Sequence, residues 1–352
     1  MKSAKFLRDS WRSGGLNMGD TRPSAIDLFS GCGGLSLGLR LAGYRVVAAV
    51  EIDRKAAQTY RLNHPDVVLM EQDITRLEPR ELMERCGIRP GQLNLLAGCP
   101  PCQGFSRIRT RNGSSSNADP RNNLAMSFLD FAVALKPRHL LLENVPGLRA
   151  QPLWTKLKRE LSAAGYRLVE DVVDAHDFGV PQRRKRLLLL GTFGRQPNVP
   201  ARCDNRLTVG DALAHVPEDD ELHRLRVNHS EAALRIIRAI PKNGGSRGQL
   251  PDMLKLACHG KTNGFSDVYG RMSWDRPAPT ITSGCHNPSK GRFLHPFEDR
   301  AISLREAALL QGFPPDYQFV LEHGKESIAL MIGNALPPPM IRIHAEALVS
   351  ST

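Results

Sequence analysis

The sequence predicts an α/β protein with a Rossmann-like, doubly wound and mostly parallel β-sheet, accompanied by a second, smaller domain. Two observations support this fold class. Short apolar segments alternate with helical segments from residue 25 to residue 190, an alternation typical of parallel sheets covered by helices on both faces. The chain has 352 residues, 41% of them hydrophobic, which is enough to build two domains with their own cores.

The predicted elements follow one another in a regular order. Short apolar runs predict strands at residues 25–29, 45–52, 67–70, 93–97, 139–142, 168–173 and 186–190. Apolar residues that recur with the period of a helix predict helices at residues 35–41, 55–62, 124–135, 154–164, 304–311 and 339–348. Parallel strands end at one edge of a sheet, and open α/β sheets bind their ligands at that edge.

The regular alternation stops after Gly194. From there to about residue 272 the chain carries scattered Pro, Gly and Arg, and helical patterning returns near residue 303. We therefore predict three parts, a flexible arm at 1–21, a large domain formed by 22–194 and 301–352, and a small domain at 195–300.

The charge of the chain is strongly basic. It carries 48 Lys and Arg against 36 Asp and Glu, a formal net charge of +12. Such a balance favours a polyanionic partner because each neutralised phosphate releases condensed counterions. The alternative is a solvated basic surface that only keeps the protein soluble. No apolar run approaches the roughly 18 residues of a membrane span, and the first twenty residues lack the apolar core of a signal peptide. We expect a cytoplasmic protein.

The seven cysteines are scattered, and only Cys99 and Cys102 lie close together. Free thiols are expected in a chain without a secretory signal. A zinc ribbon needs a second close pair, which this sequence lacks, so we expect no bound metal. A thioredoxin-like redox pair stays open on spacing alone.

The first strand runs into a glycine-rich turn at residues 30–34, Ser-Gly-Cys-Gly-Gly. Glycines let the backbone approach a ligand, and the helix that follows offers free N–H groups. Glu51 ends the second strand, where its carboxylate can accept from ribose hydroxyls. The third glycine of a dinucleotide site is missing, which favours a mononucleoside such as S-adenosylmethionine; a purely structural turn is the alternative. Asp73, after the third strand, either accepts from an adenine amino group or caps a helix.

Cys102 follows the fourth strand. Pro100 and Pro101 keep the backbone extended and place Cys102 past the carboxyl end of that strand, where an exposed thiolate is a nucleophile if its pKa is lowered. An inert, buried cysteine is the alternative. A basic loop with Arg107 and Arg109 comes next, and it either folds over a phosphate backbone or stays a solvated loop.

Further charged groups come from the later strands. Glu143 ends the fifth strand, where a carboxylate beside a nucleophilic cysteine can donate a proton or share a hydrogen bond. The alternation of a strand puts Arg184 and Arg186 on one face of the sheet, and Arg183 and Lys185 on the other. We expect the first pair to face an anion or a carbonyl group in a pocket, and the second pair to face water.

Taken in order, these segments resemble the cytosine-5 DNA methyltransferases of bacteria, over roughly residues 25–194 and 270–345. Residues 27–34 look like the cofactor loop of that family. Four further segments are similar to its nucleophile, glutamate, arginine and recognition-supporting motifs, namely Pro101-Cys102-Gln103, Glu143-Asn144-Val145, Gln182-x-Arg184-x-Arg186 and residues 276–282. Residues 333–338 resemble the closing motif, with Leu336 where valine is usual.

The resemblance implies a mechanism. Cys102, as a thiolate, adds to C6 of cytosine, and Glu143 protonates or hydrogen-bonds N3. Arg186 holds O2 of the base, and Arg184 supports the site. The methyl donor is S-adenosylmethionine, which leaves as S-adenosylhomocysteine, and no metal is needed. The resemblance therefore implies a cytosine-5 methyltransferase, of the kind found in restriction–modification, that flips its base out of double-stranded DNA.

The resemblance also implies binding residues. Those expected at the cofactor lie in the glycine-rich turn and at strand ends of the large domain: Phe29, Gly31, Cys32, Gly33, Gly34, Glu51, Ile52, Asp73, Ile74, Pro101 and Asn334. Those expected at DNA lie around the nucleophile and arginine motifs: Gln103, Ser106, Arg107, Arg109 and Gln182. In the small domain, which corresponds to the family's target-recognition region, six arginines are candidates for phosphate or guanine contacts, although any one of them is more commonly solvated surface: Arg224, Arg226, Arg235, Arg238, Arg247 and Arg271. We expect a monomer on DNA.

Three other hypotheses remain. An RNA methyltransferase of the same chemistry is the nearest, but the Cys-Phe-Thr tripeptide of the tRNA-modifying branch is absent. A catalytically inactive DNA-binding regulator would have no use for Cys102, Glu143 and Arg186. A redox protein that uses Cys99 and Cys102 would explain neither the glutamate nor the arginines. It also predicts equal losses in Cys99→Ala and Cys102→Ala, whereas the methyltransferase hypothesis leaves Cys99→Ala largely active.

Overall fold

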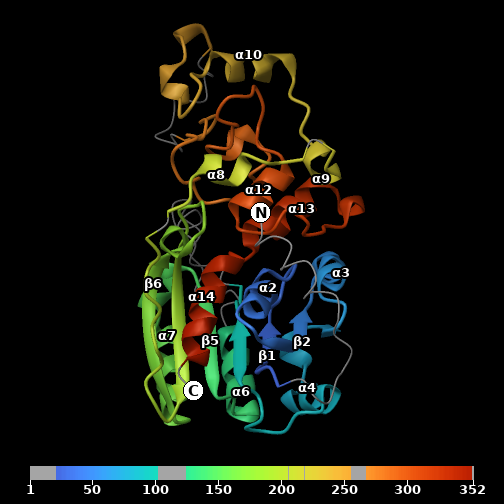
Figure 1. Ribbon diagram of the computed structural model, residues 1–352, viewed down its shortest axis with the longest axis vertical. Coiled ribbons are helices and arrows are strands. Elements are labelled where there is room, and N and C mark those ends of the chain that lie inside the picture. The colour runs from blue at the N-terminus through green and yellow to red at the C-terminus, as the bar shows by residue number, and fades with distance from the viewer. Residues whose placement is uncertain (1–20, 102–123, 205, 218, 255–266, 351–352) are drawn as a thin grey trace.

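The computed structural model describes residues 21–101, 124–204, 206–217, 219–254 and 267–350. Figure 1 shows an elongated molecule with a β-sheet and its helices in the lower half and a loop-rich part above them. Residues 1–20 of the predicted arm lie outside the described residues. Within the described part of the chain, no helix is long and apolar enough to cross a bilayer.

The sheet has seven strands in the order β3-β2-β1-β4-β5-β7-β6. Their bounds are Ser24–Leu28 (β1), Arg45–Glu51 (β2), Val68–Glu71 (β3), Leu95–Gly98 (β4), His139–Asn144 (β5), Tyr166–Asp174 (β6) and Lys185–Phe193 (β7). The pairs from β3 through β5 are parallel, whereas β7 runs antiparallel to both of its neighbours. The mostly parallel, doubly wound sheet predicted from the sequence is therefore confirmed.

Helices cover both faces of this sheet. One face carries α2 (Gly34–Leu41), α3 (Arg54–Asn63) and α14 (Pro338–Val349), and Figure 1 shows α14 beside α2. The other face carries α4 (Pro79–Cys86), α6 (Leu124–Leu135) and α7 (Pro152–Ala163). The C-terminal helix thus returns to the N-terminal half of the sheet.

The apolar run Leu187–Leu190 illustrates why both faces are covered. Leu187 and Leu189 enter the core beneath α4, α6 and α7, whereas Leu188 and Leu190 enter the core beneath α2 and α14. Successive side chains of a strand point to opposite faces, so a strand that is buried on both sides has to be apolar throughout.

The remaining helices belong mainly to the upper part. The α-helices are α8 (Val209–Leu213), α9 (Glu221–Arg224), α10 (Glu231–Ala239), α12 (Leu304–Leu310) and α13 (Gly324–Asn334). The short 3₁₀ helices along the chain are η1 (Ile74–Arg76), η4 (Pro146–Ala150), η5 (Ala175–Phe178), η6 (Arg247–Gln249), η7 (Asp252–Leu254), η8 (Pro288–Lys290) and η9 (Leu321–His323). The helices α4, α8–α10 and α13 were not predicted from the sequence.

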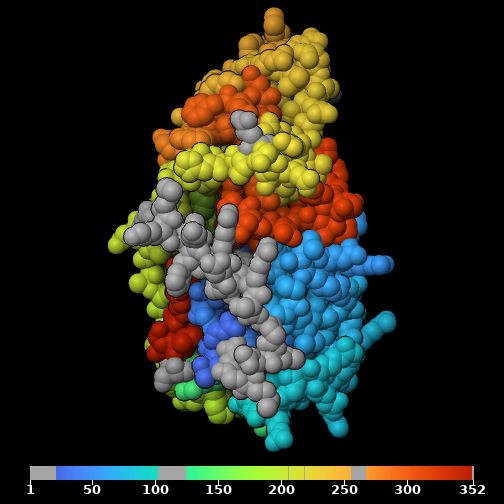
Figure 2. Space-filling model, turned by 45° about the vertical axis from the view of Figure 1, so that its right-hand side comes forward, coloured from blue at the N-terminus to red at the C-terminus, as the bar shows by residue number. Residues whose placement is uncertain are grey.

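The upper part has a core of its own. It joins apolar side chains of α8 and of residues 272–293 to those of α12 and α13. This core also reaches Leu37 of α2 and Ala56 of α3. Figure 2 shows the red surface of the C-terminal helices lying directly on the blue surface of the N-terminal third. The predicted boundary at residue 301 stays a prediction, because this core draws side chains from both sides of it.

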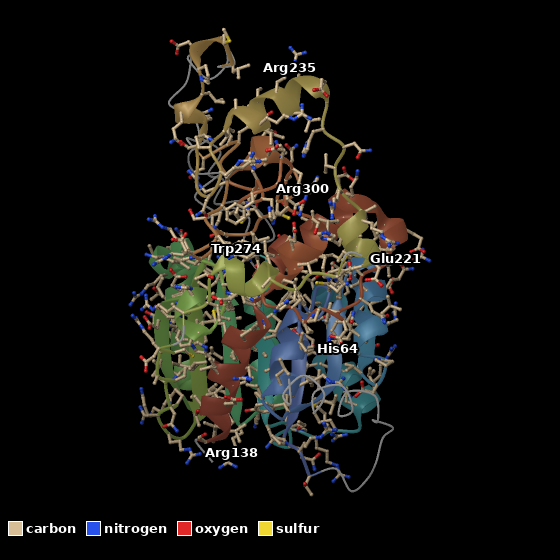
Figure 3. All side chains as sticks on the ribbon, turned by 45° about the horizontal axis from the view of Figure 1, so that its top comes forward. His64, Arg138, Glu221, Arg235, Trp274 and Arg300 are labelled. Atoms are coloured by element: carbon tan, nitrogen blue, oxygen red, sulfur yellow. The ribbon has the colours of Figure 1, made fainter. Side chains whose placement is uncertain are left out.

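Arg271 is buried within the upper part of the molecule and does not lie on its surface. Its side chain is 0% exposed, donates hydrogen bonds to four backbone carbonyls and pairs with Asp299 Oδ1 at 2.5 Å. The suggestion that Arg271 contacts DNA is therefore corrected. Arg235, by contrast, extends from the outer side of α10 (Figure 3) and is exposed.

We predict that Arg271→Met lowers the free energy of unfolding by about 3 kcal/mol, because it leaves four buried carbonyls without donors. Urea denaturation followed by circular dichroism measures this change. The matched control, Arg235→Met, changes the same quantity by less than about 0.5 kcal/mol, as expected for an exposed site. Equal effects of the two substitutions would contradict a structural role for Arg271.

Candidate active site

A cavity of about 1450 Å³, which we call the main cavity, opens at the carboxyl ends of β1, β2, β4 and β5. The strand order reverses between β1 and β4, which is where open α/β sheets bind ligands. The start of β7, residues 280–283 and the last turns of α13 close the other side. The main cavity therefore combines segments from the beginning, middle and end of the chain.

The turn after β1 is held in place by Glu51. The Gly31 N–H donates to Glu51 Oε2 and the Asp53 N–H donates to Oε1, both at 2.7 Å. Burial raises the pKa of this carboxyl, although the two N–H donors favour its charged form. Phe29, just before the turn, has a φ of 65°, a conformation that costs energy for a residue with a side chain.

The glycines of the turn have different tasks. A Cβ on Gly31 would meet no atom within 4 Å, so this residue leaves open space at the main cavity. A Cβ on Gly33 would lie 2.6 Å from His64 Nε2, and one on Gly34 would lie 2.6 Å from the Leu336 carbonyl oxygen. Gly33 and Gly34 therefore permit close packing. Gly33, expected at the cofactor, is not among the residues that line the cavity.

The other residues expected at the cofactor do line the main cavity: Phe29, Gly31, Cys32, Gly34, Glu51, Ile52, Asp73, Ile74, Pro101 and Asn334. Cys32 lines it although its side chain is buried and its thiol lies 3.7 Å from the Met331 carbonyl oxygen. Ile52 is 66% exposed at the rim. Asp73 caps η1 by accepting from the Thr75 N–H, and this hydrogen bond lowers its pKa.

Glu143 lies at the end of the main cavity opposite the glycine-rich turn. Its side chain is 2% exposed; its Oε1 lies 2.7 Å from Arg186 Nε, and its Oε2 accepts a hydrogen bond from the Cys99 thiol at 2.6 Å. The carboxylate, the guanidinium and the thiol come from β5, β7 and the end of β4. This pairing of Glu143 with Arg186 agrees with the predicted orientation of the arginines, since Arg183 and Lys185 are exposed.

Arg184 supports the site from below. It is 2% exposed and donates to the carbonyl oxygens of Ile281, Gly333 and Ala335 at 2.9, 2.8 and 3.3 Å. Burial, together with the nearby Arg186, lowers the pKa of this guanidinium. Arg184 therefore positions two segments around the cavity. Its guanidinium is already hydrogen-bonded to backbone carbonyl oxygens.

Gln182 has a similar structural role, and its expected contact with DNA stays a prediction. It is 0% exposed; its amide donates to the Leu310 carbonyl and to Gln311, and its oxygen accepts from the Ile281 N–H. Both ends of the amide are therefore used within the protein. The other residues expected at DNA, and Cys102, lie outside the described residues: Gln103, Ser106, Arg107 and Arg109.

Two residues contribute in ways that the sequence did not predict. Asn144 is buried and donates to the Pro100 carbonyl oxygen at 3.0 Å, which fixes the segment leading to Cys102. Cys99 contacts Glu143, as described above. Asn144 directly follows Glu143 in the predicted glutamate motif, so its place in that motif could have indicated a role at the site. No motif of the sequence indicated the contact between Cys99 and Glu143.

Acidic and basic residues line different ends of the main cavity. Near the glycine-rich turn the ionisable lining residues are Glu51, Asp53, Asp73 and Lys55, whereas near Glu143 they include four consecutive basic residues, 183–186. The acidic end suits a ligand with a positive centre and disfavours a pyrophosphate; the basic end suits a phosphate backbone or a carbonyl group. Within the described part of the chain, no cluster of three or more His, Cys, Asp or Glu side chains could hold a metal.

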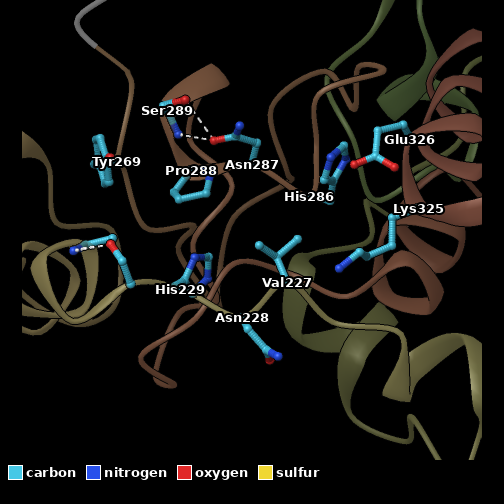
Figure 4. Close-up of a pocket in the computed structure, with 12 residues that line it drawn as sticks. Val227, Asn228, His229, Tyr269, His286, Asn287, Pro288, Ser289, Lys325 and Glu326 are labelled. Atoms are coloured by element: carbon cyan, nitrogen blue, oxygen red, sulfur yellow. Dashed lines mark hydrogen bonds between the residues drawn. The ribbon is translucent and has the colours of Figure 1, made fainter.

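A second cavity of about 280 Å³ lies between the loop before α10, residues 286–289 and the start of α13. Figure 4 shows His286 beside Glu326, and Ser289 hydrogen-bonded to Asn287. Its described lining residues include no cysteine and no arginine. The carboxylate, guanidinium and thiol groups of Glu143, Arg186 and Cys99 therefore meet at the main cavity and not at this one.

The fold and the main cavity define an α/β protein with its candidate site at the carboxyl ends of parallel strands. A profile of the C-5 cytosine-specific DNA methylase family matches residues 24–350, and the chain belongs to that family. It is 34% identical over 347 residues to the type II methylase M.HgiDII of Herpetosiphon aurantiacus, covering 92% of this chain and 94% of that protein. It is 33% identical to the type II methyltransferase M1.HphI of Haemophilus parahaemolyticus, covering 92% and 86%.

Solved structures agree with this assignment. A putative DNA modification methyltransferase encoded within an E. coli prophage superimposes with a TM-score of 0.74 at 25% identity, covering 93% of this chain and 99% of that one. The Dnmt2 methyltransferase of S. pombe, at a TM-score of 0.62 and 18% identity, covers 94% and 99% and shows the shared fold. The protein is thus a DNA cytosine-5 methyltransferase.

Asp27 lies beneath the glycine-rich turn, and its environment leads us to expect that the free energy of unfolding depends on pH. It is fully buried and accepts from Ser36 Oγ at 2.6 Å, and burial raises its pKa from 3.8 to about 7. Between these two values the native state keeps a proton that the unfolded state loses. The free energy of unfolding therefore falls as the pH rises through this window and levels off above it.

Asp27→Asn removes this contribution. Between about pH 5 and pH 7, we expect the wild type to lose about 2 to 3 kcal/mol more stability than the variant, from two pH units at about 1.4 kcal/mol each. Urea denaturation at a series of pH values measures the difference. Parallel curves for the two proteins would show that Asp27 does not titrate in this range.

Proposed function

We propose that this enzyme transfers a methyl group from S-adenosylmethionine to C5 of a cytosine flipped out of double-stranded DNA, through a covalent adduct between Cys102 and C6. The observation that carries the proposal is the buried Glu143–Arg186 pair at the basic end of the main cavity. It lies next to the segment that leads into Cys102 and across the cavity from the glycine-rich turn.

The acidic end of the main cavity fits the methyl donor. S-adenosylmethionine would supply a methyl group already activated on a positively charged sulfur. Glu51, Asp53 and Asp73 provide a negative environment for that charge and for the amino group, and Ile52 offers an apolar surface to the adenine ring. Gly31 leaves space beside them, and Ser30 adds a buried hydroxyl without a hydrogen-bond partner among the described residues.

At the other end, the protein's own groups activate the base. Cytosine C5 is a poor nucleophile, so the Cys102 thiolate adds to C6 and places an electron pair on the ring. Glu143 hydrogen-bonds or protonates N3, which stabilises that charge, while Arg186 contacts O2 and holds the Glu143 carboxylate. After C5 has been methylated, the C5 proton passes to water or hydroxide and the bond to Cys102 breaks, which restores the aromatic ring.

The substrate must be taken out of the duplex for these contacts to form. The net charge of +12 and the exposed arginines of the upper part, including Arg224, Arg226, Arg235 and Arg238, provide phosphate contacts that offset the cost of unstacking. We propose a type II modification role, as in M.HgiDII and M1.HphI, performed by a monomer on DNA.

The proposal is tested by bisulfite sequencing of plasmid DNA from a host without cytosine methyltransferases. Wild type is expected to protect cytosines within one recognition sequence, whereas Cys102→Ser is expected to protect none, because the hydroxyl is a far weaker nucleophile. Cys203→Ala, at a cysteine outside the main cavity, is the matched control and should retain protection. Protection by Cys102→Ser would overturn the covalent mechanism. Absence of protection by the wild type would overturn the proposed substrate.

The cofactor assignment makes its own prediction. Ile52→Ala should weaken the binding of S-adenosylhomocysteine by about tenfold, since truncation removes apolar contact worth on the order of 1 to 2 kcal/mol. Isothermal titration calorimetry measures the dissociation constant. Leu62→Ala, at a residue that is also half exposed but lies outside the cavity, should bind like the wild type. Unchanged affinity in Ile52→Ala would argue against adenine binding at this rim.

A further inference from the structure

We propose that Cys99 is a positioning residue for the methylation reaction, which acts by donating its thiol hydrogen to Glu143. This inference rests on the proposed role of Glu143 and extends it to a residue outside the nucleophile motif. The sequence indicated that Cys99→Ala would remain largely active, whereas this proposal leads us to expect a loss of rate.

The geometry of the carboxylate supports this role. Among the described residues, Glu143 Oε1 forms an ion pair with Arg186, whose Nε lies at 2.7 Å, and Oε2 accepts a hydrogen bond from Cys99 Sγ at 2.6 Å. The two partners come from strands on opposite sides of β5, because β4 and β7 are its neighbours in the sheet. The ion pair and the hydrogen bond therefore hold the carboxylate from both flanks. If the thiol donor is lost, the side chain is held on one oxygen only.

Cys99 acts here as a donor and keeps its proton. Burial and the adjacent Glu143 carboxylate raise the pKa of this thiol well above its ordinary value, against the smaller opposing effects of Arg186 and Arg184. A thiol of this kind is a poor nucleophile, since the thiolate is the reactive form. The two cysteines of the Cys-Pro-Pro-Cys segment therefore have different tasks, with Cys99 orienting the acid and Cys102 attacking the base.

The position of Cys99 explains why a short donor is needed. It is the first residue after β4, and the Cys99 N–H donates to the Leu28 carbonyl oxygen, which ties the backbone to the end of β1. Its side chain is directed across the sheet edge to β5, whose Glu143 is 2% exposed. An alanine at residue 99 would leave Glu143 Oε2 buried without this donor, and an unsatisfied buried acceptor is costly.

The first test compares the kinetics of four proteins on DNA that carries the recognition sequence. We expect Cys99→Ala to lower kcat by about tenfold, the loss typical of one hydrogen bond to a charged group, with the KM for S-adenosylmethionine unchanged within about twofold. The alkaline limb of its pH–rate profile should move to higher pH, because Glu143 serves N3 as a proton donor and a carboxyl with one donor fewer keeps its proton to higher pH. Cys99→Ser keeps a donor and should recover most of the rate. Cys203→Ala controls for the loss of a thiol elsewhere.

A second measurement needs no activity. The infrared S–H stretching band of Cys99 is obtained as the difference between wild type and Cys99→Ser. A strong hydrogen bond to the carboxylate lowers the frequency of this band, so Glu143→Gln, whose neutral amide is a weaker acceptor, should raise it. A band that does not respond to Glu143→Gln would overturn the proposed contact.

The outcomes separate this inference from the proposed function. An inactive wild type would overturn the proposed substrate, and the infrared band would then decide on Cys99 alone. An active wild type together with a Cys99→Ala variant of equal kcat and unchanged pH profile would overturn the positioning role while the methylation mechanism stands. A loss of rate in Cys99→Ser equal to that in Cys99→Ala would also overturn it. Serine keeps a donor at this position, so equal losses would mean that residue 99 contributes something other than its donor.

Discussion

The buried guanidinium of Arg184 is the interaction on which the active site depends. It lies at the start of β7 and donates to carbonyl oxygens of Ile281, Gly333 and Ala335, residues 97 to 151 positions further along the chain. These carbonyls belong to the loop at residues 280–283 and to the end of α13. Because a buried charge has to be compensated, the fold brings both segments to the sheet, and in doing so it closes the main cavity.

The same constraint explains how the cavity acquires two different ends. The carboxyl ends of β1 and β2 provide the glycine-rich turn and its acidic neighbours, whereas β5 and β7 provide Glu143 and the arginines. Gly34 contacts the Leu336 carbonyl closely, so the segment held by Arg184 also packs on the turn. A methyl donor with a positive centre and a base with an adjacent phosphate backbone can therefore bind to one cavity without competing for the same charges.

Much of this arrangement was predictable from the sequence. The strands and helices of the sheet lie within a few residues of their predicted positions because their apolar patterns are strong, and the parallel strands place Glu51 and Glu143 at one edge. The arginines at the start of β7 reach the same edge because that strand runs antiparallel, a direction that the sequence did not indicate. The helix α4 was missed because Leu82 is its only buried side chain. Gln182 was assigned to DNA through the resemblance and Arg271 by residue type alone. Whether a polar side chain faces DNA or a buried carbonyl depends on segments about 30 to 130 residues away, which the local sequence does not describe.

The antiparallel direction of β7 has a consequence for how the site is encoded. The other active-site strands deliver their functional side chains at their carboxyl ends, next to loops that tolerate changes of length. In β7 the order is reversed, since Arg184 directly precedes the strand and Arg186 is its second residue, so their direction is fixed by the register of the strand. Since a shift of one residue moves every side chain to the opposite face, a single insertion or deletion near residue 186 would turn the two inward arginines toward water and present Arg183 and Lys185 to Glu143 instead. Sequence length is therefore as strictly constrained there as residue identity.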